Sequence, residues 1–226
     1  MQNKLTAILE ELKSHAPFTL FGALTGIVCM LLFRNLDHDT SERIFYVFHP
    51  THVLLSALVT ASMFKLHSRS RKFVLVLLVG FFGSLGVATL SDSLIPYAGE
   101  LLLGMHIHLH AHEHAGFVQE AHIGFIECWY LVIPAAILGV LIAYFRPKTT
   151  FPHAGHVLLS TWASSFHMLM AFGGDVPTWK LAGSFGFLFL AVWLPCCISD
   201  IVFPLLFVNS PAGIGCSHKT HVEAEQ

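Results

Sequence analysis

The sequence has few charged residues, and this scarcity is its first informative property. Asp, Glu, Lys and Arg together make up 12% of the 226 residues, about half of the ~25% typical of a soluble domain. A small globule has too much surface to cover with so few charges, so a water-soluble enzyme is largely excluded. The formal net charge of -2 also gives no reason to expect nucleic acid as a partner.

Several common motifs are missing as well. The five cysteines form no CxxC pair, which argues against a disulfide framework or a Cys-rich zinc module. The sequence contains no Walker or GxGxxG motif, which would indicate nucleotide binding, and no GxSxG motif, which would indicate a nucleophilic serine. No cleavable signal peptide is apparent, because residues 1–16 place leucines at helical spacing among polar residues. This pattern predicts an interfacial amphipathic helix.

Hydrophobic residues are abundant, at 54% of the chain. Since lipid forces a spanning segment to satisfy its own backbone hydrogen bonds, long apolar stretches predict helices rather than strands. The expected fold is an all-α, polytopic integral membrane protein with about six transmembrane helices, and the lipid bilayer is its first partner. The stretches are Phe18–Phe33, Val53–Leu66, Phe73–Ile95, Ile123–Phe145, Val157–Phe172 and Leu181–Val208.

Basic residues predict the orientation in the membrane. Lys65, Arg69, Arg71 and Lys72 follow the second stretch, and Arg146 and Lys148 follow the fourth. Lys and Arg concentrate in cytoplasmic loops. Both termini are therefore expected in the cytoplasm, in a cytoplasmic or inner membrane.

An internal duplication organises the chain. The motif HPTHVLLS at residues 49–56 matches HAGHVLLS at residues 153–160 in six of eight positions, and SDSLIP at 91–96 matches SDIVFP at 199–204. Two polar motifs recur in the same order at nearly the same interval, which indicates a repeat. Because each unit would contain three helices, the second would be inverted, as in many secondary transporters.

The predicted domains follow this repeat. Residues 1–16 form the interfacial helix and residues 17–104 the first three-helix repeat. Residues 105–122 connect it to the second repeat, residues 123–208, and residues 209–226 form a cytoplasmic tail.

Histidines supply the candidate functional residues, since there are 16 of them against 12 Lys and Arg, and ionisable groups within a membrane are costly and usually functional. Histidines at i and i+3 share a helical face, and imidazole with carboxylate suits a divalent transition metal. The topology predicts an outer site of His49, His52 and Asp92. It predicts an inner site of His153, His156 and Asp200.

The connecting segment is rich in the same ligand types, as a metal-binding tract is. We expect it to capture metal beside the outer site through His106, His108, His110, His112, His114, Glu120 and His122. Cys196 and Cys197, one turn before Asp200, are candidate soft ligands, but we interpret them as small core residues.

The sequence therefore predicts a protein that binds and transports zinc, nickel, cobalt, iron or copper, linked to protons or another gradient, rather than an enzyme. One alternative is a membrane metalloenzyme with Glu120 or Glu127 as base. Another is an electron-transfer subunit with two b-haems, ligated by the pairs His52–His167 and His67–His153. The sequence leaves open whether the chain self-associates or has a partner subunit.

Overall fold

All the regular secondary structure in the described part of the chain is helical. The computed structural model describes residues 4–68, 72–104, 128–147, 150–172, 177–197 and 203, and no strand occurs among them. The predicted all-α class is confirmed. The elements are α1 (Lys4–Phe33), α2 (His38–His67), α3 (Phe73–Thr89), the π-helix η1 (Leu90–Leu94), α4 (Ile95–Leu102), α6 (Trp129–Phe145), α7 (Thr150–Phe172) and α8 (Thr178–Cys197).

Four stretches among the described residues are long and apolar enough to cross a membrane. They are Ala16–Phe33, His38–Leu66, Phe73–Leu102 and Thr178–Cys196. The outer surface is apolar too: the side chains of Leu32, Leu102 and Phe145 are 73%, 77% and 76% exposed. Large exposed apolar surfaces mark contact with lipid or another protein. These features are consistent with an integral membrane protein.

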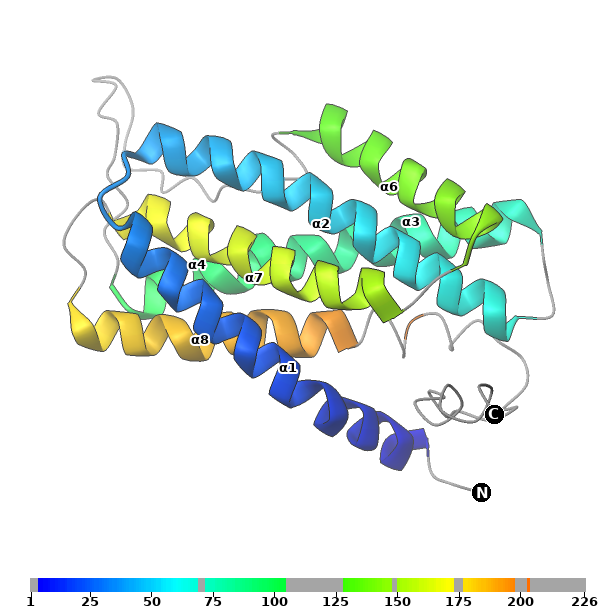
Figure 1. Ribbon diagram of the computed structural model, residues 1–226, viewed down its shortest axis with the longest axis horizontal. Helices are drawn as coiled ribbons and strands as arrows, with labels where there is room; N and C mark the ends of the chain where they lie inside the picture. Colours follow the sequence, from blue (N-terminus) through cyan, green and yellow to red (C-terminus); the bar gives the residue numbers. More distant parts are fainter. Residues whose placement is uncertain are drawn as a thin grey trace, which may run out of the picture.

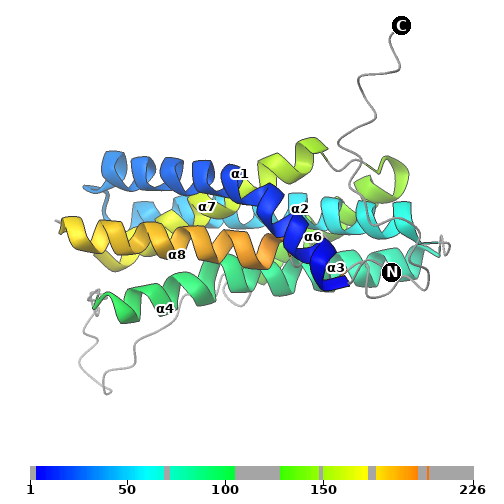
Figure 2. The ribbon, with the colours of Figure 1, turned by 90° about the horizontal axis from the view of Figure 1, so that it is seen from below.

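Helix α1 joins two segments that the sequence suggested were separate. It runs without interruption from Lys4 to Phe33, so the amphipathic N-terminal segment and the first apolar stretch form one helix. Pro17 lies inside it, and a proline inside a helix removes a backbone hydrogen bond and bends it. Figure 2 shows this helix bending along its length.

The helices lie along the long axis of the molecule, and consecutive ones run in opposite directions except for α3, η1 and α4, which continue end to end (Figure 1). Helix α2 is central, because it packs against α3 and α6 on one side and against α7 on the other. Two hydrophobic cores result. One joins α2 to α3 and α6, and the other joins α2 to α1, α7 and α8. The candidate site lies where these cores meet.

Glycines allow α3 and α6 to approach α2 closely. A Cβ at position 139 would overlap the backbone oxygen of Leu54 on α2. A Cβ at position 80 would lie 2.7 Å from the Val140 side chain and 2.8 Å from that of Ala61. Small residues at such crossings are the usual means by which membrane helices pack tightly.

Helix α2 begins far earlier than its apolar stretch suggests. Its N-cap is Asp37, whose carboxylate accepts hydrogen bonds from the backbone N–H and the hydroxyl of Thr40, both at 2.9 Å. Such a cap satisfies one of the backbone donors that a helix start leaves unpaired. As a result His49 and His52 lie near the middle of α2 rather than at its start.

The third apolar stretch forms a longer helical rod than expected. Helices α3 and α4 are joined end to end by η1, so the rod continues from Phe73 to Leu102 instead of ending near Ile95. In η1 the N–H of Ile95 donates to the carbonyl of Leu90, five residues earlier. Short π-helical turns within α-helices are frequent at functional sites. Asp92 lies in this turn.

Candidate metal centre

Asp92 is a completely buried carboxylate with four hydrogen bonds. Its Oδ2 accepts from Nδ1 of His49 at 2.9 Å and from Nδ1 of His52 at 2.6 Å. Its Oδ1 accepts from the hydroxyls of Ser91 at 2.7 Å and Ser160 at 2.8 Å. Its side chain is 0% exposed. The structure thus brings together the three residues that were grouped as an outer site.

The bonding of Asp92 differs from that of a direct metal ligand. Both imidazoles use Nδ1 for the carboxylate, which leaves Nε2 of His49 and Nε2 of His52 buried without a hydrogen-bond partner among the described residues. In metal sites a ligating histidine commonly donates its other ring N–H to a carboxylate, which fixes the orientation of the ring. Asp92 is therefore placed to orient two imidazoles rather than to bind an ion itself.

The π-turn holds Asp92 in position through a hydrogen bond from α7. In an i to i+5 pattern the carbonyl of Ser91 would accept from residue 96, but Pro96 has no N–H. The hydroxyl of Ser164 lies 2.9 Å from this carbonyl and 2.8 Å from that of Ser160, so its single proton is shared between the two acceptors. A buried carbonyl that would otherwise lack a donor is thereby satisfied. The rod and α7 are thus bonded on both sides of Asp92, by Ser160 and by Ser164.

The second HxxH pair lies beside the first. His156 of α7 is 0% exposed, and its ring centroid is 5.5 Å from that of His52. The ring of His153 is 5.1 Å from that of His156. The sequence assigned the two pairs to separate outer and inner sites, whereas the structure brings His52 and His156 side by side. The physical reason is that the early start of α2 moves its motif to the middle of the bundle, where it meets α7.

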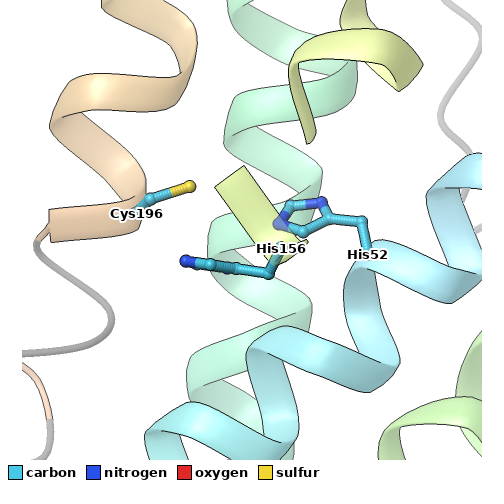
Figure 3. A group of neighbouring side chains, drawn as sticks. All are labelled: His52, His156 and Cys196. Atoms are coloured by element: carbon cyan, nitrogen blue, oxygen red, sulfur yellow. The ribbon is translucent and has the colours of Figure 1, made fainter. Parts of the chain in front are cut away.

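Cys196 completes a group of potential ligands. One ligand atom each from His52, His156 and Cys196 lies within 4.8 Å of the others, and all three residues are buried. Figure 3 shows their side chains converging from α2, α7 and α8. The sequence interpretation favoured a core residue over a soft ligand for Cys196, whereas the structure places its thiol beside the two imidazoles. Its place one helical turn before the second Ser-Asp motif was the signal available in the sequence.

This donor set can hold a small, borderline or soft cation. Two neutral imidazoles and a thiolate match Zn²⁺ or copper better than harder ions. Zn–N and Zn–S bonds of ~2.0 and ~2.3 Å place tetrahedral ligand atoms about 3.5 Å apart, so the three ligands would close inward by about 1 Å on binding. The thiol would lose its proton at the same step.

A second buried pair was missed by the sequence analysis. Nδ1 of His167 on α7 lies 2.7 Å from Oε1 of Glu100 on α4, and both side chains are 2% exposed. Glu100 follows Asp92 by eight residues, about two helical turns, so this spacing was the available signal. Phe45 of α2 stands between the two polar groups, stacked on His49 and edge-on to His167.

The haem alternative paired His52 with His167. In the structure these side chains have other partners, since His52 contacts Asp92 and His156 while His167 contacts Glu100. The second haem pair involved His67, whose side chain is not among those described.

A further group of ligand type, His38, Asp39 and Glu42, lies at the start of α2. Asp39 is 74% exposed, and acidic side chains in the first turn of a helix are stabilised by its dipole. A metal is not needed to explain this group. The remaining predicted ligands lie outside the described residues: Asp200, His106, His108, His110, His112, His114, Glu120 and His122.

Comparison of the chain with models of protein families, with curated proteins and with solved structures finds no significant match. The site therefore has to be interpreted from its own geometry. That geometry is a buried His, Cys and Asp cluster in an all-helical protein with helices suited to a membrane.

Proposed function

We propose that this integral membrane protein binds a transition metal ion at His52, His156 and Cys196 and carries it across the bilayer. The observation that supports this most strongly is the convergence of these three buried side chains from three different helices. A buried cluster of ionisable groups in a membrane is costly unless it serves a function.

The donor chemistry narrows the expected metals. Zinc, nickel, cobalt, iron and copper all bind imidazole, but a thiolate ligand favours zinc and copper over the harder ions. Zinc is the simplest choice for a carrier, because it has no redox chemistry and tolerates changes of coordination number. Zinc is therefore the ion with which the proposal is tested.

Asp92 acts as a positioning residue in this proposal. It presents the Nε2 atoms of His49 and His52 toward the interior, and its own charge is balanced by four hydrogen bonds. His49 contributes a further imidazole close to His52. It offers an ion a second nitrogen during entry to the cluster or exit from it.

The duplication supports transport rather than static storage. We propose that residues 17–104 and 123–208 are inverted three-helix repeats, giving about six transmembrane helices. One repeat would supply His52 and Asp92, and the other His156, Cys196 and Ser160. Ion sites at the interface of inverted repeats suit alternating access, in which one repeat moves against the other. Asp200 and the segment at 106–122 complete the proposal as a second carboxylate and a capture region.

Binding can be tested by elemental mass spectrometry of the detergent-purified protein after equilibration with zinc. The wild type should hold stoichiometric zinc, and His52→Ala, His156→Ala and Cys196→Ala should each lose it. Cys29→Ala is the matched control, because Cys29 is a free cysteine on α1 outside the cluster. Equal zinc content in all of these proteins would contradict the proposed site.

Transport needs a separate measurement in sealed liposomes that contain a zinc-sensitive dye. The wild type should take up zinc, and Cys196→Ala should not. The alternative of a membrane metalloenzyme is favoured by the dense hydrogen bonding of Asp92, which suits a fixed site. Zinc that is held through purification without uptake into liposomes would favour the enzyme and contradict transport.

A further inference from the structure

The pair formed by His167 and Glu100 is not used by the proposed metal site. Its two side chains are each 2% exposed and their polar atoms are 2.7 Å apart. A buried carboxylate in a membrane protein costs several kcal/mol unless it is paired, and such groups commonly serve in proton relays. The pair shares one proton along the bond between Nδ1 and Oε1, whichever group carries it.

The pair lies near one end of the bundle. Glu100 lies two residues before the end of α4, and His167 lies five before the end of α7. Gly104, just beyond α4, is exposed, and its carbonyl accepts from Nζ of Lys180 on α8 at 2.7 Å. The metal cluster lies deeper, since Asp92 precedes Glu100 on the same rod by about 12 Å.

Phe45 separates the pair from the cluster. Its ring stacks on His49 with centroids 5.3 Å apart and meets His167 edge-on at 5.5 Å. A phenyl ring carries no exchangeable proton, so His49 and His167 cannot pass a proton through it. The two sites can therefore hold different protons at the same time.

Two elements, the rod α3–η1–α4 and helix α7, nevertheless contribute residues to both sites. The rod α3–η1–α4 supplies Asp92 and Glu100, and α7 supplies Ser160 and His167, which bond to them respectively. A displacement of α7 along this rod would change both contacts together. Such a shared element with two arrangements is the physical basis of coupling between sites.

Titratable side chains also lie on α4 and α7 and on the elements packed against them. The described ones are Tyr97 of α4; His153 and His156 of α7; Asp92 of η1; Lys13 and Cys29 of α1; His38, Asp39, Glu42, Arg43, Tyr46, His49, His52 and Lys65 of α2; and Lys180 and Cys196 of α8. Lys180 lies at the same end of α4 as the pair.

We propose that His167 and Glu100 form a proton-binding site that links proton movement to metal movement, an inference that rests on the proposed metal transport. In the resting pair the imidazole carries a proton on Nε2 and shares a second one with Glu100, so uptake of one more proton from water at one face gives a neutral Glu100 beside an imidazolium. Release of that proton at the other face restores the pair. Zinc moves in the opposite direction during the same cycle.

The test uses the full chain in liposomes, with zinc as the ion and the membrane potential clamped to zero. If one proton is exchanged per zinc ion, a gradient of about one pH unit changes the zinc accumulation ratio about tenfold in the wild type. In Glu100→Gln zinc should still be taken up, but the accumulation ratio should no longer respond to the gradient. Asp39→Asn, which alters an exposed carboxylate, should keep the tenfold response.

Several outcomes would overturn the inference. One is a zinc accumulation ratio that still changes tenfold with the pH gradient in Glu100→Gln. Another is zinc uptake by the wild type that does not depend on the pH gradient; this result would leave the proposed function standing. Zinc content of each purified variant reports an intact cluster. If Glu100→Gln loses zinc, His167→Gln is measured in its place, and loss of zinc in both variants shows that the pair is structural. A wild type that neither holds nor transports zinc contradicts the proposed function itself.

Discussion

The hydroxyl of Ser160 donates to Oδ1 of Asp92 at 2.8 Å, across the boundary between the two copies of the repeated motif. Ser160 ends the second HVLLS motif, and Asp92 belongs to the first Ser-Asp motif. The carboxylate that orients His49 and His52 is therefore itself held by the other half of the chain. The two halves build one cluster.

Asp92→Asn should weaken zinc binding by about 10–100-fold, the range found when a residue that orients metal ligands is lost. The amide oxygen can still accept from both imidazoles, but the negative charge that strengthens these bonds is lost, and its NH2 group replaces the oxygen that accepts from Ser91 and Ser160. A competitive zinc titration of the purified protein measures the effect. Asp39→Asn, at the exposed start of α2, should bind zinc as the wild type does.

Ser160→Ala should lower stability more than zinc affinity. Oδ1 of Asp92 would keep only Ser91 as a donor, and a hydrogen bond to a buried charge contributes about 1.5–3 kcal/mol. Denaturation of the detergent-solubilised protein measures the change. Ser184→Ala is the matched control: Ser184 is also buried, but its hydroxyl donates only to the carbonyl of Lys180. Equal losses in both variants would contradict the special role of Ser160.

Ser164→Ala and Pro96→Ala should show coupled effects. Removing the Ser164 hydroxyl leaves the carbonyl of Ser91 without the donor described here, at a cost of about 1–3 kcal/mol. In a Pro96→Ala background, residue 96 regains an N–H that can donate to this carbonyl, so the same loss should be smaller. A double-mutant cycle by denaturation measures the difference. Simple additivity of the two changes would contradict the proposed role of Pro96.

Gly139→Ala should destabilise the packing of α6 on α2 by about 1–3 kcal/mol, as overpacked cores do. The new methyl group would overlap the backbone oxygen of Leu54, which cannot move aside as a flexible side chain can. Gly86→Ala is the matched control in α3, because a Cβ there meets nothing within 4 Å. That control should be neutral or slightly stabilising, since alanine favours helix more than glycine does.

The cap of α2 should make stability depend on pH. The side-chain and backbone hydrogen bonds from Thr40 hold the pKa of the Asp37 carboxyl below its usual value. The stabilisation is therefore present above the unfolded pKa and is lost as the pH falls through the lowered folded pKa. Melting temperatures between neutral and acidic pH should fall less in Asp37→Asn than in the wild type. The same fall in both proteins would contradict this contribution.

The sequence predicted the helical class from its long apolar stretches. It predicted the proximity of His49, His52 and Asp92 from the motifs at facing ends of two consecutive helices. It did not predict where the elements end. His49-Pro50 resembles a helix start, yet the Asp37 cap begins α2 eleven residues earlier. Pro96 resembles a helix end, yet η1 continues into α4, and the Ser164 hydroxyl lies within hydrogen-bond distance of the Ser91 carbonyl that Pro96 leaves without a backbone donor.

The contact between the two HxxH motifs was not predicted from the sequence, because it depends on tertiary packing. The contact of His52 with His156 requires α2 and α7 to cross at the level of both motifs, and the tight crossings at glycines are set by three-dimensional fit. The participation of Cys196 follows from the same crossing. Asp200 and the histidines of residues 106–122 remain predictions.

The π-turn has a consequence for the angular phase of the rod. A single extra residue in a helical turn rotates everything beyond it by about 100° around the axis. Asp92 and Glu100 both reach α7 because η1 corrects their relative azimuth. If Leu90–Leu94 were regular α-helix, Asp92 and Glu100, eight residues apart, would differ by about 80° in azimuth, so one carboxylate would face α7 and the other would turn away.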